Sequence, residues 1–94
     1  MMYLTTANIK KHIQQLKEQK LEAGIEAIND GKNWRLRIVP FDWRAEYPDD
    51  AMLLYMGSGK NRKVKTVKSE KSIFNLADRY GIRYNFISFK FEIP

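Results

Sequence analysis

The residues best suited to chemistry gather in one stretch, "GSGKNRKVKTVKSEKS", at residues 57–72. Six of its sixteen residues are Lys or Arg and only Glu70 is acidic, so the stretch accounts for +5 of the net charge of +6. Cationic groups concentrated in this way displace counterions from the phosphates of a nucleic acid. The alternative is a solvated sheet face whose lysines protect an exposed strand edge. Because a merely soluble surface would mix both signs, the stretch favours an anionic partner.

The glycines of this stretch do not form a nucleotide-binding loop. That motif places Gly-Lys-Ser/Thr four residues after a first Gly, between a strand and a helix. Here Lys60 follows "GSG" directly, Asn61 comes next, and a strand is expected to follow. The spacing excludes nucleoside triphosphate binding, and the glycines are typical of a hairpin turn.

Catalytic or metal-binding residues have no suitable arrangement in this sequence. His12 is the only histidine and is expected on the polar side of a helix, and the chain has no cysteine. Asp49 and Asp50 are adjacent, which suits a solvated loop, and Ser58 lacks a nucleophile-elbow motif. We therefore expect a protein that is not an enzyme, with no metal site and no other cofactor.

Length and composition predict one domain over residues 1–94. The chain is 44% hydrophobic and 13% aromatic, which is enough for one modest core. The absence of cysteine fits a reducing compartment, and the apolar runs are far shorter than the roughly 18 residues that span a bilayer. We expect a cytoplasmic protein with no membrane partner.

The first half of the chain predicts a helix followed by a hairpin. Thr5 or Thr6 is the expected N-cap, and Gly24 is expected to end the helix near residue 23 in a left-handed conformation. Asp30-Gly31 is a strong signal for a two-residue turn. That turn would place residue 26 opposite residue 35, with Arg35 and Arg37 on the face away from the core.

The second half predicts strands at 51–56 and 62–68, a second helix, and a last strand at 83–93. Leu54 is expected opposite Val64, which would place residues 63 and 65 on the face away from the core. Ser69 is the expected N-cap of the second helix and Gly81 its C-terminal glycine. The last strand is expected to bury its apolar side chains, namely Ile87, Phe89, Phe91 and Ile93.

These elements predict an α+β fold in the order α-β-β-β-β-α-β. Each expected strand has one apolar face, so we expect a largely antiparallel sheet with both helices on one face. The order of the strands within the sheet is left open by the sequence.

The function that the sequence favours is non-enzymatic binding of nucleic acid, with duplex DNA contacted through its phosphates. The predicted surface joins a basic sheet face to the hairpin that follows it. Its residues are Arg35, Arg37, Lys60, Arg62, Lys63, Lys65, Lys68 and Lys71.

The alternative is a protein-interaction module, such as an inhibitor or accessory factor. It would bind an acidic protein through the same basic face, or use the acidic aromatic loop 41–50, which contains Phe41, Trp43 and Tyr47. Tyr84 and Phe86 could stack on bases, but packing under a loop or in a dimer interface is the commoner role. A homodimer is left open.

Overall fold

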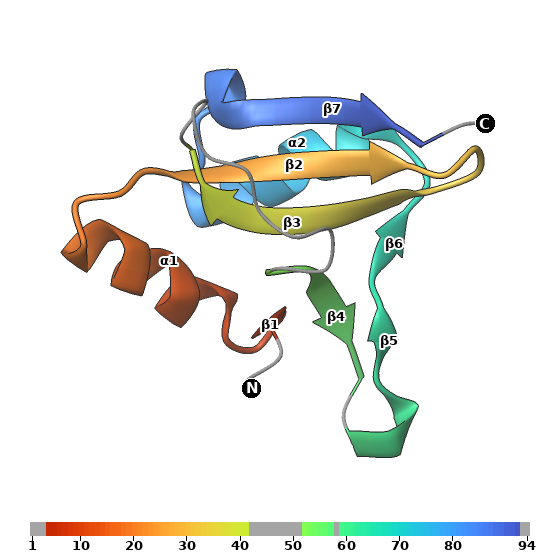
Figure 1. Cartoon of the computed structure of the whole chain (residues 1–94), viewed down its shortest axis with the longest axis horizontal. Helices are drawn as coiled ribbons and strands as arrows, with labels where there is room; N and C mark the ends of the chain where they lie inside the picture. Colours follow the sequence, from red (N-terminus) through yellow and green to blue (C-terminus); the bar gives the residue numbers. More distant parts are fainter. Residues whose placement is uncertain (1–3, 42–51, 58, 93–94) are drawn as a thin grey trace.

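The computed structural model describes residues 4–41, 52–57 and 59–92 and contains two helices among short strands (Figure 1). The elements, in chain order, are β1 (Leu4–Thr5), α1 (Ile9–Glu18), β2 (Ala23–Asn29), β3 (Trp34–Pro40), β4 (Leu54–Met56), the 3-10 turn η1 (Gly59–Asn61), β5 (Lys63–Val64), β6 (Thr66–Val67), α2 (Glu70–Tyr80), the 3-10 turn η2 (Tyr84–Phe86) and β7 (Ile87–Phe91).

The strands form two sheets. The larger has the order β6-β3-β2-β7, and the smaller has the order β1-β4-β5. Three of the five strand pairs are antiparallel, whereas β2–β7 and β1–β4 are parallel. The predicted α+β class is confirmed, and the element order broadly matches the prediction. The differences are the short β1 and the division of the strand expected at 62–68 into β5 and β6.

Both helices contribute to one core, on one side of the β2–β3 hairpin. Strand residues of alternating position join it, with Ala27 opposite Leu36 and Ile25 opposite Ile38. The helices add Ile9, Ile13, Leu16, Ile73, Leu76 and Ala77. Period-2 and period-3.6 spacing therefore point to the same buried surface, as expected from the sequence.

The molecule is compact. Its Cα radius of gyration is 12.7 Å, close to the roughly 12 Å typical of a globular chain of this length. In the described ranges, no helix combines the length and apolarity required to cross a membrane.

The first helix ends earlier than predicted. Lys20 adopts a positive φ of 62°, and the Leu21 N–H donates to the Leu16 carbonyl over 2.9 Å, which closes the helix at that point. Gly24 lies inside β2 without a positive φ, so the helix cap assigned to it is wrong. The N-cap is Asn8 rather than either threonine. Pairing with β3 explains the early end, because it requires an extended chain from residue 23.

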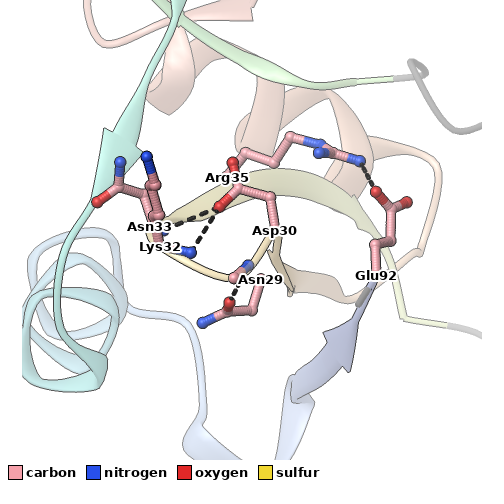
Figure 2. A network of polar contacts seen from close by, with 7 residues as sticks. Asn29, Asp30, Lys32, Asn33, Arg35 and Glu92 are labelled. Carbon is pink, nitrogen blue, oxygen red and sulfur yellow. Dashed lines mark hydrogen bonds and ion pairs between the residues drawn. The ribbon is translucent and has the colours of Figure 1, made fainter. Parts of the chain in front are cut away.

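The β2–β3 hairpin has a four-residue loop instead of the predicted two-residue turn. The Asp30 carboxylate accepts hydrogen bonds from the N–H groups of Lys32 and Asn33, each over 3.0 Å (Figure 2). These bonds lower the pKa of Asp30. The longer loop shifts the register by two residues, so Glu26 lies opposite Arg37. An even shift keeps every side chain on its predicted face.

The second helix begins and ends as predicted. The Ser69 hydroxyl accepts a hydrogen bond from the Ser72 N–H over 3.3 Å. Gly81 has a φ of 70°, and the Ile82 N–H donates to the Ala77 carbonyl over 2.9 Å. This arrangement satisfies the last carbonyls of α2 and turns the chain towards η2.

Strand β7 is only partly buried. Its residues 87, 89 and 91 lie opposite Ile25, Ala27 and Asn29 of β2, on the core side as predicted. Yet Phe89 remains 39% exposed and Phe91 61% exposed, so the expectation that each is buried is wrong. The reason is the position of β7 at the edge of the sheet, where one flank has no neighbouring strand among the described residues. Ile93 lies outside the described residues.

Candidate nucleic-acid interface

The chain from the end of β4 to the first turn of α2 carries six basic side chains, which we call the cationic strip. It runs from the hairpin tip at η1 along β5 and β6 to the start of α2 (Figure 1). Its residues are Lys60, Arg62, Lys63, Lys65, Lys68 and Lys71.

A tight turn holds the tip of the strip. Gly57 has a φ of 82°, and a Cβ added there would lie 2.7 Å from the carbonyl oxygen of Asn61. Both the backbone conformation and the space therefore require glycine. The turn continues into η1, which contains the exposed Lys60.

Most of the strip faces solvent. Lys60, Lys63, Lys68 and Lys71 are exposed, whereas Lys65 and Arg62 are half-buried. Within the described part of the chain, none of the five lysines forms an ion pair with a carboxylate. Their charges are therefore available to an anionic partner.

The register of the strip differs by one residue from the predicted one. Val64 lies opposite Tyr55, and Lys63 lies opposite Met56. The Lys65 N–H donates to the Leu54 carbonyl over 2.9 Å. A one-residue shift moves every side chain to the other face of the sheet. Lys63 and Lys65 therefore lie on the same face as Leu54, whereas Val64 lies on the face of Tyr55. The prediction that Lys63 and Lys65 share a face with Tyr55 is wrong.

The strip also crosses from one sheet to the other. Val64 belongs to the three-stranded sheet and Thr66 to the four-stranded sheet. Thr66, rather than a lysine, lies opposite Arg35. The strip therefore follows the junction of the two sheets instead of covering one flat sheet face.

The two arginines of β3 are engaged in ion pairs on the sheet. Arg37 is only 3% exposed, and its Nη2 atom lies 2.7 Å from a carboxylate oxygen of Glu26 on the neighbouring strand. Arg35 pairs with Glu92 just beyond β7 (Figure 2). The Arg37 pair joins β3 to β2, and the Arg35 pair joins β3 to the residue that follows β7, so both arginines help to hold the sheet. The structure does not place them in the exposed strip.

One basic residue near the strip was missed by the sequence reasoning. Trp34 lies opposite Val67, so the hairpin loop 30–33 lies beside the chain that continues to Lys68. The exposed Lys32 of that loop is next to β6 in Figure 2. The proximity depends on the β3–β6 register, for which the sequence offers no local signal.

The aromatic residues near η2 have packing partners. The rings of Phe86 and Phe41 lie 4.6 Å apart, and Phe86 packs against the core. The Tyr84 hydroxyl donates to the Asp78 carboxylate, and this hydrogen bond raises the pKa of Tyr84. Phe41 is itself 40% exposed; the rest of loop 41–50, including Trp43 and Tyr47, lies outside the described residues.

His12 is not the exposed side chain that the sequence predicted. It is half-buried, and its Nε2 atom lies 2.9 Å from the Ile38 carbonyl oxygen, which ties α1 to β3. In residues 4–41, 52–57 and 59–92 no group of three or more His, Asp or Glu side chains is arranged to hold a metal ion.

No family model matches the chain, and no curated protein or solved structure is significantly similar to it.

Proposed function

We propose that this chain is a non-enzymatic nucleic-acid-binding protein that contacts the phosphates of duplex DNA through the cationic strip. The observation that carries the proposal is the concentration of six basic side chains between residues 60 and 71, with four lysines exposed. Glu70, in the first turn of α2, is the only acidic residue between residues 60 and 71. A surface of one sign attracts a polyanion over several ångströms and speeds association.

The shape of the strip suits a phosphate backbone. Lys63 and Lys65 are separated by one residue of extended chain, which places their Cα atoms roughly 6.5–7 Å apart. This is comparable to the distance between successive phosphates of one strand. Lys65 is half-buried, and long basic side chains commonly bury the stem while the ammonium group reaches solvent.

The proposed surface is narrower than the one predicted from the sequence. Arg35 and Arg37 are already paired with carboxylates, so a phosphate would have to compete with Glu92 and Glu26. We therefore assign phosphate contacts to the strip and add Lys32 as a flanking contact. The proposal includes a cytoplasmic location and no cofactor, in keeping with a cysteine-free chain in a reducing compartment.

An acidic protein is the alternative partner for the same lysines. An acidic protein would contact the same lysines, but in that case the chain would not be expected to bind DNA duplexes of unrelated sequence. Phosphate contacts are independent of base sequence, so direct titration with DNA separates the two partners.

The test is fluorescence anisotropy with labelled 20-base-pair duplexes of two unrelated sequences and a single strand, at several salt concentrations. The double variant Lys63→Gln, Lys68→Gln removes two exposed ammonium groups from the strip. We expect it to weaken binding to both duplexes equally and to lower the slope of log K against log salt by about two. A matched control, Lys10→Gln with Lys17→Gln, changes two exposed lysines of α1 and should leave the slope unaltered.

Circular dichroism shows whether each variant keeps its fold. No binding of the wild-type protein at low salt would overturn the proposal in favour of an acidic protein partner. Binding with the same slope in both double variants would place the DNA elsewhere on the surface.

A further inference from the structure

The open edge of β7 is the strongest feature that the proposed function does not use. The larger sheet ends at β7, and among the described residues no strand lies beyond it (Figure 1). Phe91 and Phe89, at 61% and 39% exposed, both belong to this edge strand. An edge strand with exposed apolar side chains is a template for pairing with another strand.

The register of β7 fixes which backbone groups point outward. Ile25 is paired in parallel with Ile87, and the Glu92 N–H donates to the Asn29 carbonyl over 2.8 Å. In a parallel pair, alternate residues of a strand bond to one neighbour. Residues 88, 90 and 92 therefore bond to β2, and residues 87, 89 and 91 direct their N–H and C=O groups away from it.

We propose that β7 pairs with β7 of a second copy of this chain, antiparallel and centred on Phe89. A twofold axis at Phe89 makes the two Phe89 residues exchange both of their backbone hydrogen bonds. It also places Phe91 opposite Ile87 of the other copy, so the Phe91 N–H meets the Ile87 carbonyl. The Ile87 N–H keeps its bond to the Tyr84 carbonyl within η2. The pairing thus forms four hydrogen bonds between the copies.

The side chains fit this register on both faces. On the core side, the exposed Phe89 and Phe91 rings meet the apolar residues of the other copy, beside Trp34, which already contacts both rings. On the other side, Lys90 lies opposite Ser88 of the second copy. Moving the axis by one residue to Lys90 would place the two Lys90 side chains directly opposite each other, and like charges in that position are destabilising. The register centred on Phe89 avoids this contact between like charges and places the uncharged Ser88 opposite Lys90.

The interface is small, which sets the strength of the dimer. Pairing of one five-residue strand falls below the roughly 1,200 Å² that marks weak or transient interfaces. We expect a dissociation constant between about 1 µM and 1 mM. A dimer of this kind forms reversibly as concentration rises.

A consequence of the dimer rests on the proposed function. The joined sheet would have eight strands, in the order β6-β3-β2-β7 followed by the reverse order in the second copy. Seven spacings of about 4.8 Å then separate the two β6 strands by about 34 Å along the sheet. Half-sites one turn of B-DNA apart lie about 34–36 Å from each other, so the two cationic strips have the spacing of one helical turn.

The test uses the full chain without nucleic acid, so its outcome is independent of DNA binding. Sedimentation velocity between about 10 µM and 1 mM should show a monomer–dimer equilibrium. Ser88→Lys places a second ammonium group opposite Lys90 at two symmetric sites of the dimer and should raise the dissociation constant about fivefold at low salt. Adding Lys90→Glu to that variant creates two opposite-charge pairs and should restore or exceed wild-type affinity. Residues 88 and 90 are exposed, and circular dichroism controls for folding.

Hydrogen exchange measured by NMR gives a second result at atomic detail. The Phe89 and Phe91 amides should exchange rapidly in dilute protein and become protected as the dimer forms. A protein that stays monomeric at 1 mM overturns the proposal. A dimer that ignores both charge changes and leaves these amides unprotected overturns it as well, because its interface would lie elsewhere.

Discussion

Replacing Gly24 by alanine tests how closely β2 and β7 approach each other. A Cβ at residue 24 would lie 2.7 Å from the carbonyl oxygen of Phe86 and 3.2 Å from the Cβ of Phe41. The Phe86 oxygen belongs to the backbone that leads into β7, so no side-chain rotation relieves the contact. The two strands would have to separate at this end.

The expected cost follows from two opposing effects. Crowding of a well-packed site typically destabilises by about 1–3 kcal/mol. Replacing glycine by alanine also restricts the unfolded chain, which offsets about 0.4–1 kcal/mol. We therefore expect Gly24→Ala to lower the free energy of unfolding by about 1–2 kcal/mol. For a domain of this size the Tm should fall by about 4–16 °C.

Thermal unfolding followed by circular dichroism measures the change, with Gly31→Ala as the matched control. Gly31 has a φ of 103° and no atom within 4 Å of an added Cβ, so only backbone strain acts there. Hydrogen exchange distinguishes the two sites, because Gly24→Ala should also speed exchange of the Ser88 amide, whereas Gly31→Ala should not. If Gly24→Ala were as stable as the wild type or more so, the close approach of β2 and β7 would be refuted.

Three further outcomes are expected. Lys20→Gly should raise the free energy of unfolding by about 1 kcal/mol in a denaturant titration, because Lys20 has a left-handed conformation that costs least for glycine; a loss of stability would contradict the helix end assigned here. A chain ending at Arg83 should show no cooperative thermal transition, because β2 would lose its parallel partner and part of the core would be uncovered; a transition near that of the full chain would contradict this. Tyr84→Phe should remove one component of the tyrosine absorbance change at 295 nm, the component that titrates above the ordinary tyrosine pKa of 10.0. Because the folded-state pKa of Tyr84 is raised, its hydrogen bond to Asp78 stabilises the fold below an ordinary tyrosine pKa of 10.0 and is lost as pH rises through the folded pKa. If the component that the variant loses titrated at the ordinary tyrosine pKa, this bond would be refuted.

Local signals in the sequence were sufficient for α2. Ser69, the buried Ile73, Leu76 and Ala77, and Gly81 lie within one contiguous segment, and the two caps act on backbone groups only a few residues away. The same holds for the alternation of β3, where every second residue is buried in the main core. Such features depend on chain geometry, which a sequence displays directly.

Strand registers were predicted less well because they depend on loop details. The Asp30 carboxylate accepts two hydrogen bonds in the longer β2–β3 loop, and the pairing is shifted by two residues. Gly57 and η1 shift the β4–β5 pairing by one residue. An even shift is harmless to the assignment of faces, whereas an odd shift reverses it. This explains why the faces of β3 were predicted correctly and those of Lys63 and Lys65 were not.

The glycine misassigned as a helix cap illustrates a non-local cause. Gly24 is followed by an apolar residue, as a helix-ending glycine often is, and nothing nearby in the sequence distinguishes the two roles. Its actual neighbours, Phe41 and Phe86, are 17 and 62 positions away in the chain. The antiparallel pairing of β2 with β3 brings Phe41 to Gly24, and the parallel pairing of β2 with β7 brings Phe86 there.

The proposed function survives the error in register because of how the charges are distributed along the strip. Its basic residues occupy both odd and even positions, from Lys60 to Lys71, so either face assignment leaves several of them exposed. Arg37 shows the contrary case: a single basic residue on a paired strand can be neutralised by one carboxylate opposite, and the observed register supplies Glu26. Charge density in a short segment is therefore less sensitive to an error in register than the predicted face of any one residue. The salt slope measures that density directly, since it counts the phosphates neutralised and does not depend on which face presents them.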